Sequence, residues 1–315
     1  MTETHVALLD DRAVLRARGG DARPLLQRLV TGNVDAVASG HAVYALLLTP
    51  QGKFLFDFFL VADPADAGAV LIDCAASRAS ELLKRLALYR LRADAVFEDA
   101  SADLAVCAVW GDLPGALGLG QVADRPGAAA AFAGGTAFID PRLAALGARA
   151  VIPCDGPCDG AQHALEGLGA QRAGGDAYRA FAVSAGVPDG ARDIRAEGDF
   201  PIECNLDLLN GIDFRKGCFV GQEVASRAHR KGRARKRLVI AHGEGPLPAA
   251  GCDVTMAGAR VGSLAGGSAE TGLALVFLDR VAKAQGSAAE AGGVKLRLTV
   301  PAYADFRLDV SQAGA

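Results

Sequence analysis

The feature that most constrains the fold of this chain is a change of pattern near residue 235. Beyond that point, short apolar segments alternate with glycine-containing turns. Such a series of short strands is typical of a small closed or nearly closed β-domain. The predicted strands occupy residues 236–242, 254–256, 260–264, 273–278 and 294–300. We therefore predict a domain boundary near residue 235, which divides the chain into domains of residues 1–235 and 236–315.

The first domain mixes strand and helix patterns. Residues 43–49 and 54–61 are apolar and flank a Thr-Pro-Gln-Gly turn sequence, so we predict a β-hairpin there. Asp21 and Ser80 are predicted to be the N-caps of two helices that carry leucines at helical spacing. The other expected elements are strands at 70–74, 95–98 and 104–110, a loop over 111–135, and helices over 160–169 and from Asp176 onward. This mixture predicts an α+β region built on antiparallel sheet.

Composition and charge narrow the functional classes. The 315 residues are 51% hydrophobic with a formal net charge of -3, which supports a sizeable core but gives no overall attraction to nucleic acid or acidic membranes. No window holds the roughly 18 consecutive apolar residues that a membrane helix needs. The first five residues lack a basic stretch followed by an apolar run. We expect a cytoplasmic protein without a membrane partner.

The seven cysteines are odd in number and scattered along the chain, so we expect reduced thiols and no disulfide framework. Cys154 and Cys158 form the one close pair. A single pair cannot complete a tetrahedral zinc site, and no second pair follows it. We predict a turn with two incidental thiols and no metal site.

The chemistry is concentrated in residues 200–237. Cys218 follows Arg215 and Lys216, and nearby positive charge makes a thiol reactive by stabilising its thiolate. Such a thiolate can attack an electrophile or bind a soft metal, although one thiol cannot hold an iron–sulfur cluster alone. The alternative is a buried cysteine that fills a small space, which is common for a free cysteine.

Two further features lie beside the thiol. Gly217 and Gly221 permit a close backbone approach, and Gln222 and Glu223 can read an amino-amide edge such as that of a pterin ring. A glycine turn leading into an exposed element is an equally good interpretation. The basic residues that follow can meet nucleic acid, an acidic protein or the glutamate tail of a folate, or form a solvated face. They are Arg227, His229, Arg230, Lys231, Arg233, Arg235, Lys236 and Arg237.

Residues 216–223 read KGCFVGQE and closely resemble the signature of the YgfZ-type folate-binding proteins, within the superfamily of the glycine-cleavage T-protein. The resemblance extends through both flanks of the signature and to residues 12–15, 20–22, 29–31 and 48–53, so it spans nearly the whole chain. It implies a T-protein-like α+β region of two interwoven subdomains, one of them ferredoxin-like, and a small C-terminal β-barrel around a central cavity.

The resemblance also implies a function. It suggests a tetrahydrofolate-binding accessory protein for the assembly or repair of iron–sulfur proteins, with iron–sulfur assembly or client proteins as partners. Cys218 is then the reactive thiol or cluster-exchange ligand. The expected ligands of tetrahydrofolate or a derivative are Asp57, Lys216, Gly217, Gly221, Gln222 and Glu223.

Two departures from the T-protein pattern bear on catalysis. The paired acid of the hairpin keeps Asp57 but has Phe56 in place of the other acid, and Ser184 stands where T-proteins carry a glutamate. One alternative function is therefore a folate-dependent one-carbon (aminomethyl) transferase or demethylase, whose activity these changes put in doubt. A second is a tRNA-binding or tRNA-modification accessory that uses the basic run.

Overall fold

The structure of the protein is a computed structural model, which describes residues 3–111, 117–154, 167, 169–230, 232, 234–284 and 286–308. The chain forms two compact units, each assembled from separate segments. Unit 1 comprises Met1–Leu48, Leu55–Tyr178 and Leu209–Val220, and unit 2 comprises Thr49–Phe54, Arg179–Leu208 and Gly221–Ala315. The predicted division at residue 235 differs from this one and stays a prediction.

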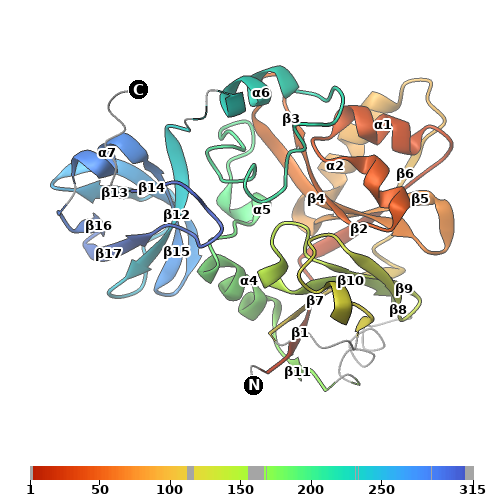
Figure 1. Ribbon diagram of the computed structural model, residues 1–315, viewed down its shortest axis with the longest axis horizontal. Helices are drawn as coiled ribbons and strands as arrows, with labels where there is room; N and C mark the ends of the chain where they lie inside the picture. Colours follow the sequence, from red (N-terminus) through yellow and green to blue (C-terminus); the bar gives the residue numbers. More distant parts are fainter. Residues whose placement is uncertain are drawn as a thin grey trace. The chain divides into compact units, whose positions relative to one another are not determined.

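The larger hydrophobic core of unit 1 lies between a five-stranded sheet and two helices (Figure 1). The strands, in spatial order, are β3 (Val43–Leu48), β4 (Phe54–Asp63), β5 (Asp66–Ala75), β2 (Arg12–Arg18) and β6 (Val96–Asp99). The helices are α1 (Ala22–Leu29) and α2 (Ala76–Arg90). Leucines three and four residues apart on α1 and α2 give each helix one apolar face, and that face packs onto the sheet.

Strand alternation separates the two faces of this sheet. Phe56, Phe58 and Leu60 of β4 point into the core with the helices. Asp57 and Phe59 therefore project from the opposite face, because successive side chains of a strand alternate. This opposite face carries the polar cluster described below. Because the apolar residues of β4 fix which face of the strand is buried against the helices, they also fix the face on which Asp57 and Phe59 lie.

The second sheet of unit 1 has six strands around a smaller core. They are β11 (Gln171–Arg172), β1 (His5–Leu8), β7 (Leu104–Trp110), β10 (Ala148–Pro153), β9 (Gly135–Ile139) and β8 (Ala129–Phe132), in that order. Pairing is antiparallel except between β1 and β11. Short 3₁₀ helices occur at η1 (Val34–Ser39), η3 (Gly120–Val122) and η4 (Ala144–Leu146).

Unit 2 contains a closed six-stranded barrel. Its strands, in order, are β12 (Lys236–Gly243), β15 (Thr271–Phe277), β14 (Ala259–Ser268), β13 (Asp253–Met256), β16 (Ala289–Ala291) and β17 (Val294–Thr299). Helix α7 (Leu278–Lys283) follows β15. The other helices within the described residues are α4 (Gly175–Ser184), α5 (Gly190–Asp193) and α6 (Gln222–Arg230). None of the helices in the described ranges combines the length and hydropathy that a membrane crossing requires.

The predicted fold class is confirmed: mixed α and β structure precedes a C-terminal barrel. The predicted hairpin is β3 and β4, and β7 matches its predicted range. Ser80 is not an N-cap, because α2 continues directly from β5 and begins at Ala76. Strand β8 lies within the expected loop over 111–135. The helix predicted over 160–169 lies mostly outside the described residues, as does Cys158.

Candidate functional site

Cys218 is exposed, in contrast to the alternative of a buried cysteine. It belongs to the segment of unit 1 that ends at Val220. Among the cysteines that the structure describes, Cys74, Cys107 and Cys204 are buried, and Cys154 and Cys252 are half-buried. Of these six described thiols, Cys218 is thus the one that a partner in solution can reach most easily.

Burial makes two of the other thiols, Cys74 and Cys204, unreactive. Desolvation raises the pKa of Cys74 to about 12. It also raises the pKa of Cys204 well above that of an ordinary thiol. Both therefore stay protonated at neutral pH and are poor nucleophiles and poor metal ligands. No group of three or more His, Cys, Asp or Glu side chains in the described part of the chain is arranged to hold a metal ion.

Two anchors flank Cys218 in the sequence. On one side, the Lys216 ammonium donates hydrogen bonds to the carbonyl oxygens of Gln27, Val30 and Gly32, each 2.7 Å long. On the other side, the Phe219 ring is buried, and Val220 packs against the larger core of unit 1. The segment carrying the thiol is therefore attached to unit 1 both before and after the exposed residue.

The rest of the signature lies in unit 2, where α6 begins. Gly221 adopts φ 82°, a left-handed conformation that favours glycine, and its carbonyl accepts the first hydrogen bond of the helix from the Ala225 amide. Gln222 is half-buried, whereas Glu223 is exposed and pairs with Arg227 one turn along. Gly217 has open space where a Cβ atom would lie, so the backbone there is accessible.

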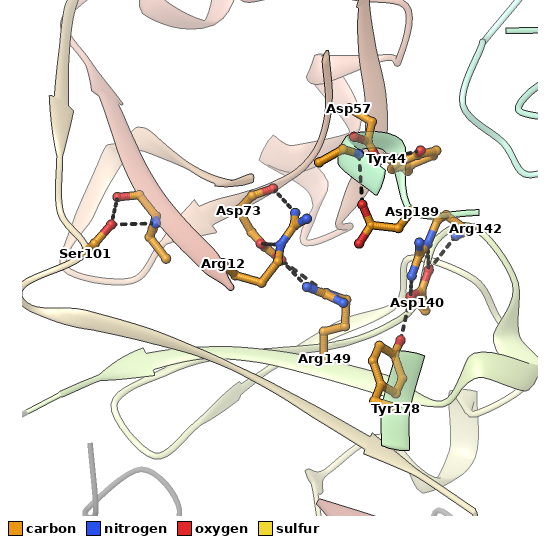
Figure 2. Close-up of polar contacts among 12 residues, drawn as sticks. Arg12, Tyr44, Asp57, Asp73, Ser101, Asp140, Arg142, Arg149, Tyr178 and Asp189 are labelled. Carbon is orange, nitrogen blue, oxygen red and sulfur yellow. Dashed lines mark hydrogen bonds and ion pairs between the residues drawn. The ribbon is translucent and has the colours of Figure 1, made fainter. Parts of the chain in front are cut away.

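Asp57 lies in a different environment, on the sheet face opposite the helices of unit 1. Its carboxylate is buried and accepts a 2.9 Å hydrogen bond from the Tyr44 hydroxyl (Figure 2). Burial, with the neighbouring Asp57 carboxylate, raises the pKa of Tyr44 well above that of an ordinary tyrosine. Tyr44 therefore keeps its proton and remains a donor to Asp57.

A buried ion network joins the two sheets of unit 1. Asp73 of β5 accepts from Arg12 of β2 at 2.6 Å and from Arg149 of β10 at 2.7 Å (Figure 2). The Asp73 side chain is fully buried, and both guanidinium groups are nearly so. One carboxylate oxygen thus accepts a charge-assisted hydrogen bond from Arg12 of the five-stranded sheet, and the other accepts one from Arg149 of the six-stranded sheet.

A second ion pair adjoins the first. Arg142 donates to Asp140 at 2.7 Å, and the Tyr178 hydroxyl donates to the same carboxylate at 3.3 Å (Figure 2). Burial alone would raise the pKa of Asp140, but the charge and hydrogen bonds of Arg142, together with the charge of Arg149, outweigh it, so the net pKa is lowered. Asp140 is therefore ionised at neutral pH and holds Arg142 in position.

The Phe59 ring is the centre of this polar cluster. The guanidinium carbons of Arg149, Arg142 and Arg12 lie 4.4, 4.9 and 5.7 Å from its centroid. Three cations on one aromatic ring form an unusual concentration of cation–π contacts. Together with Asp57, the cluster offers both acceptors and cations on one face of the sheet of unit 1.

Two residues of the basic run form ion pairs within unit 2. Lys236 pairs with Glu203 at 3.2 Å, and Arg237 pairs with Asp207 at 2.7 Å. Lys231 and Arg233 lie outside the described residues. The described basic residues therefore include two that serve the packing of unit 2.

The sequence reasoning missed most of the polar cluster. Asp73 lies within the apolar strand VLIDCA, and Arg149 lies within the apolar segment ARAVIP. A charged residue in the middle of a buried strand almost always has a partner, so these positions carried a usable signal. The partners themselves, such as Arg12 and Tyr44, come from other strands and could not be paired from the sequence.

Comparison with known proteins identifies similar chains. A family profile described as "CAF17, C-terminal beta-barrel domain" matches residues 235–306. The human protein named "Iron-sulfur cluster assembly factor IBA57, mitochondrial" is 34% identical over 288 residues, which cover 87% of this chain and 77% of that protein. The mouse protein of the same name is 34% identical over 286 residues, with 85% and 76% covered.

Among solved structures, the glycine cleavage system aminomethyltransferase T from Bartonella henselae has a similar fold. The TM-score is 0.72 at 17% sequence identity, and the match covers 95% of this chain and 85% of that chain. At this identity the likeness establishes the fold, which is that of the T-protein.

Proposed function

Because the chain belongs to the family of the IBA57 iron–sulfur cluster assembly factors, we propose that it assists the assembly or repair of iron–sulfur proteins through Cys218. The observation that carries the proposal is the exposure of Cys218 in a segment anchored on both sides. Buried thiols such as Cys204 are unsuited to this role, since a partner cannot reach them.

The proposed chemistry is ligand exchange. A cysteine thiolate is a soft ligand for iron, and a cluster needs several such ligands. Cys218 supplies one of them, and a partner protein or a small thiol supplies the others. The cluster is cargo in this scheme, which is consistent with a described structure that offers no complete ligand set of its own.

Tetrahydrofolate or a derivative is the small molecule that we propose this protein binds. Asp57 fits this group, because a buried carboxylate beside the Tyr44 hydroxyl can accept from the amino-amide edge of a pterin. Lys216 fits less well, since its three donors are already engaged. A bound reduced folate would supply a carrier for one-carbon groups.

The structure favours an accessory role over aminomethyl transfer. Phe56 packs in the core with the helices of unit 1, and the Arg78 guanidinium lies 4.2 Å from its ring centroid. Ser184 donates to the Phe181 carbonyl at 2.7 Å. Neither position supplies the second carboxylate of the T-protein pattern. The ion pairs of Lys236 and Arg237 likewise do not favour a tRNA-binding role for these two residues.

Complementation of a strain lacking the gene tests the role of Cys218. Wild-type protein should restore the activity of [4Fe–4S] enzymes, and Cys218→Ser should not. Cys252→Ser is the matched control, because Cys252 is a half-buried thiol in the barrel unit. Full restoration by Cys218→Ser at equal expression would refute the proposed thiol role.

Calorimetric titration with 5-formyltetrahydrofolate tests the folate proposal separately. Asp57→Asn should weaken saturable binding, whereas Asp66→Asn, at the exposed first residue of β5, should leave it unchanged. Absence of binding to the wild type would remove folate from the proposal without affecting Cys218.

We also propose that the protein is cytoplasmic. The named relatives are mitochondrial, and cell fractionation decides between these compartments.

A further inference from the structure

The C-terminal end of helix α1 lacks a left-handed capping residue. Its C-cap residue, Val30, has φ -102° and ψ 159°, an extended conformation. The left-handed glycine that commonly satisfies the last carbonyls of a helix is therefore missing at this end. Carbonyl groups in the last turn of a helix need donors from elsewhere, and they form the negative end of the helix dipole.

Lys216, in the last segment of unit 1, supplies donors to one carbonyl in the last turn of α1 and to two carbonyls just after the helix. Its ammonium group has three N–H donors, and the Gln27, Val30 and Gly32 carbonyls accept all three at 2.7 Å. Lys216 and Val30 are 186 residues apart in the chain. A cation at this position also interacts favourably with the helix dipole.

Neighbouring contacts attach the same two segments. The Asp213 amide donates to the Thr31 carbonyl at 3.0 Å, and the Thr31 hydroxyl donates to the Gly211 carbonyl. Beyond the thiol, Val220 packs against the core beneath the helices. Cys218 is thus an exposed residue of a segment that is attached to α1 before the thiol and to the adjoining core after it.

We infer that Lys216 is a positioning residue: it fixes the Cys218 segment to the end of α1, and it does not contact a ligand or partner. The inference rests on the proposed function, because it assigns to Lys216 the task of presenting the thiol through which that function operates. It also differs from a folate-ligand role, which would require the ammonium to give up some of its carbonyl partners.

The geometry makes lysine specific at this position. An ammonium group directs three donors toward three converging carbonyls, whereas the guanidinium of arginine is a planar fork that cannot do so. Burial lowers the pKa of Lys216 to about 8, so the group is still mainly protonated at neutral pH. Lys216→Arg therefore keeps the positive charge but cannot form all three hydrogen bonds to the carbonyls. This variant distinguishes a positioning role from a purely electrostatic effect of the charge on the thiol.

Hydrogen–deuterium exchange on the full-length protein measures the attachment directly. In Lys216→Ala and Lys216→Arg, exchange in the peptides covering residues 27–32 and 211–220 should accelerate about tenfold, as expected for loss of a helix-end interaction. Arg215→Ala is the matched control, since the Arg215 side chain is 96% exposed, and it should exchange like the wild type. Fluorescence of Trp110 verifies that unit 1 remains folded.

Chemical rescue gives a second readout. Propylammonium replaces the part of the side chain that Lys216→Ala removes, so it should restore slow exchange, and 1-propanol at the same concentration should not. Unchanged exchange in Lys216→Ala would overturn the inference, as would equal rescue by the alcohol.

The complementation assay then connects the attachment to function. Lys216→Ala and Lys216→Arg should restore [4Fe–4S] enzyme activity as poorly as Cys218→Ser does, while Lys84→Ala, at an exposed lysine of α2, should restore it fully. Faster exchange combined with full restoration would overturn the positioning role. If Cys218→Ser itself restores activity, the proposed function fails, but the exchange data still decide whether Lys216 holds the segment.

Discussion

Replacing Asp73 by asparagine should destabilise unit 1 strongly, because this carboxylate balances two buried cations. Asp73 accepts from Arg12 at 2.6 Å and from Arg149 at 2.7 Å, and its side chain has no exposed surface. Asparagine has nearly the same shape but no charge. The substitution therefore leaves packing almost unchanged and removes the electrostatic balance between the two sheets.

The expected magnitude follows from the desolvation of the arginines. Removing one partner of a buried ion pair costs about 3–5 kcal/mol, because an uncompensated charge stays buried. The asparagine oxygen can still accept one hydrogen bond, which returns about 1 kcal/mol. We expect a net loss of about 3 kcal/mol in the free energy of unfolding. The exposed pair between Arg18 and Glu98 should contribute less than about 1 kcal/mol, so Glu98→Gln is the control.

Urea unfolding followed by the fluorescence of Trp110 is the appropriate assay. This residue is the single tryptophan, and it is buried in unit 1. The double variant Asp73→Asn/Arg149→Met should recover part of the loss, with a coupling energy of about 1–3 kcal/mol. A loss for Asp73→Asn as small as that for Glu98→Gln would refute the electrostatic reasoning.

Three further predictions concern other parts of the molecule. In native protein, iodoacetamide should modify Cys218 before Cys74, Cys107 and Cys204, which should react only on unfolding; peptide mass spectrometry measures the order, and early modification of a buried thiol would contradict it. Gly186→Ala should lower the stability of unit 2 by about 2 kcal/mol, because φ is +79° and the new Cβ would meet Pro301 at 2.5 Å; circular dichroism during heating measures this, and an unchanged Tm would disprove it. The folded protein should release the Lys216 proton near pH 8, below the ordinary lysine pKa of about 10.4, so wild-type stability relative to Lys216→Met should rise between these pH values, by about 1–2 kcal/mol after allowance for solvent screening; urea unfolding at both ends of the window checks the sign.

The spacing of apolar residues and the turn sequences predicted the strands and the hairpin, because these elements depend mainly on residues close together in the chain. The short apolar segments of the barrel and the Thr-Pro-Gln-Gly hairpin appear at nearly the predicted residues. Strand β2 was missed, although its alternating RAVLRAR sequence carried the period of a strand. The start of α2 was misplaced because Ala75, which has no capping side chain, precedes it.

The candidate site was predicted less completely, for a physical reason. The exposure of Cys218 could not be decided from composition, since free cysteines are usually buried. The partners of Lys216 are backbone carbonyls, and every residue has one, so no sequence signal identifies them. The polar cluster around Phe59 likewise depends on which strands become neighbours, and that is settled only by the folded sheets.

The division of the chain into interleaved segments has a consequence for its synthesis. The polypeptide passes between the two compact units five times, and the last segment of unit 1 ends at Val220. A nascent chain therefore cannot complete this unit until about two thirds of the message has been translated and Lys216 has left the ribosome. Until then the end of α1 lacks its donor, so early termination before this lysine would leave a fragment that neither closes its first unit nor carries its thiol.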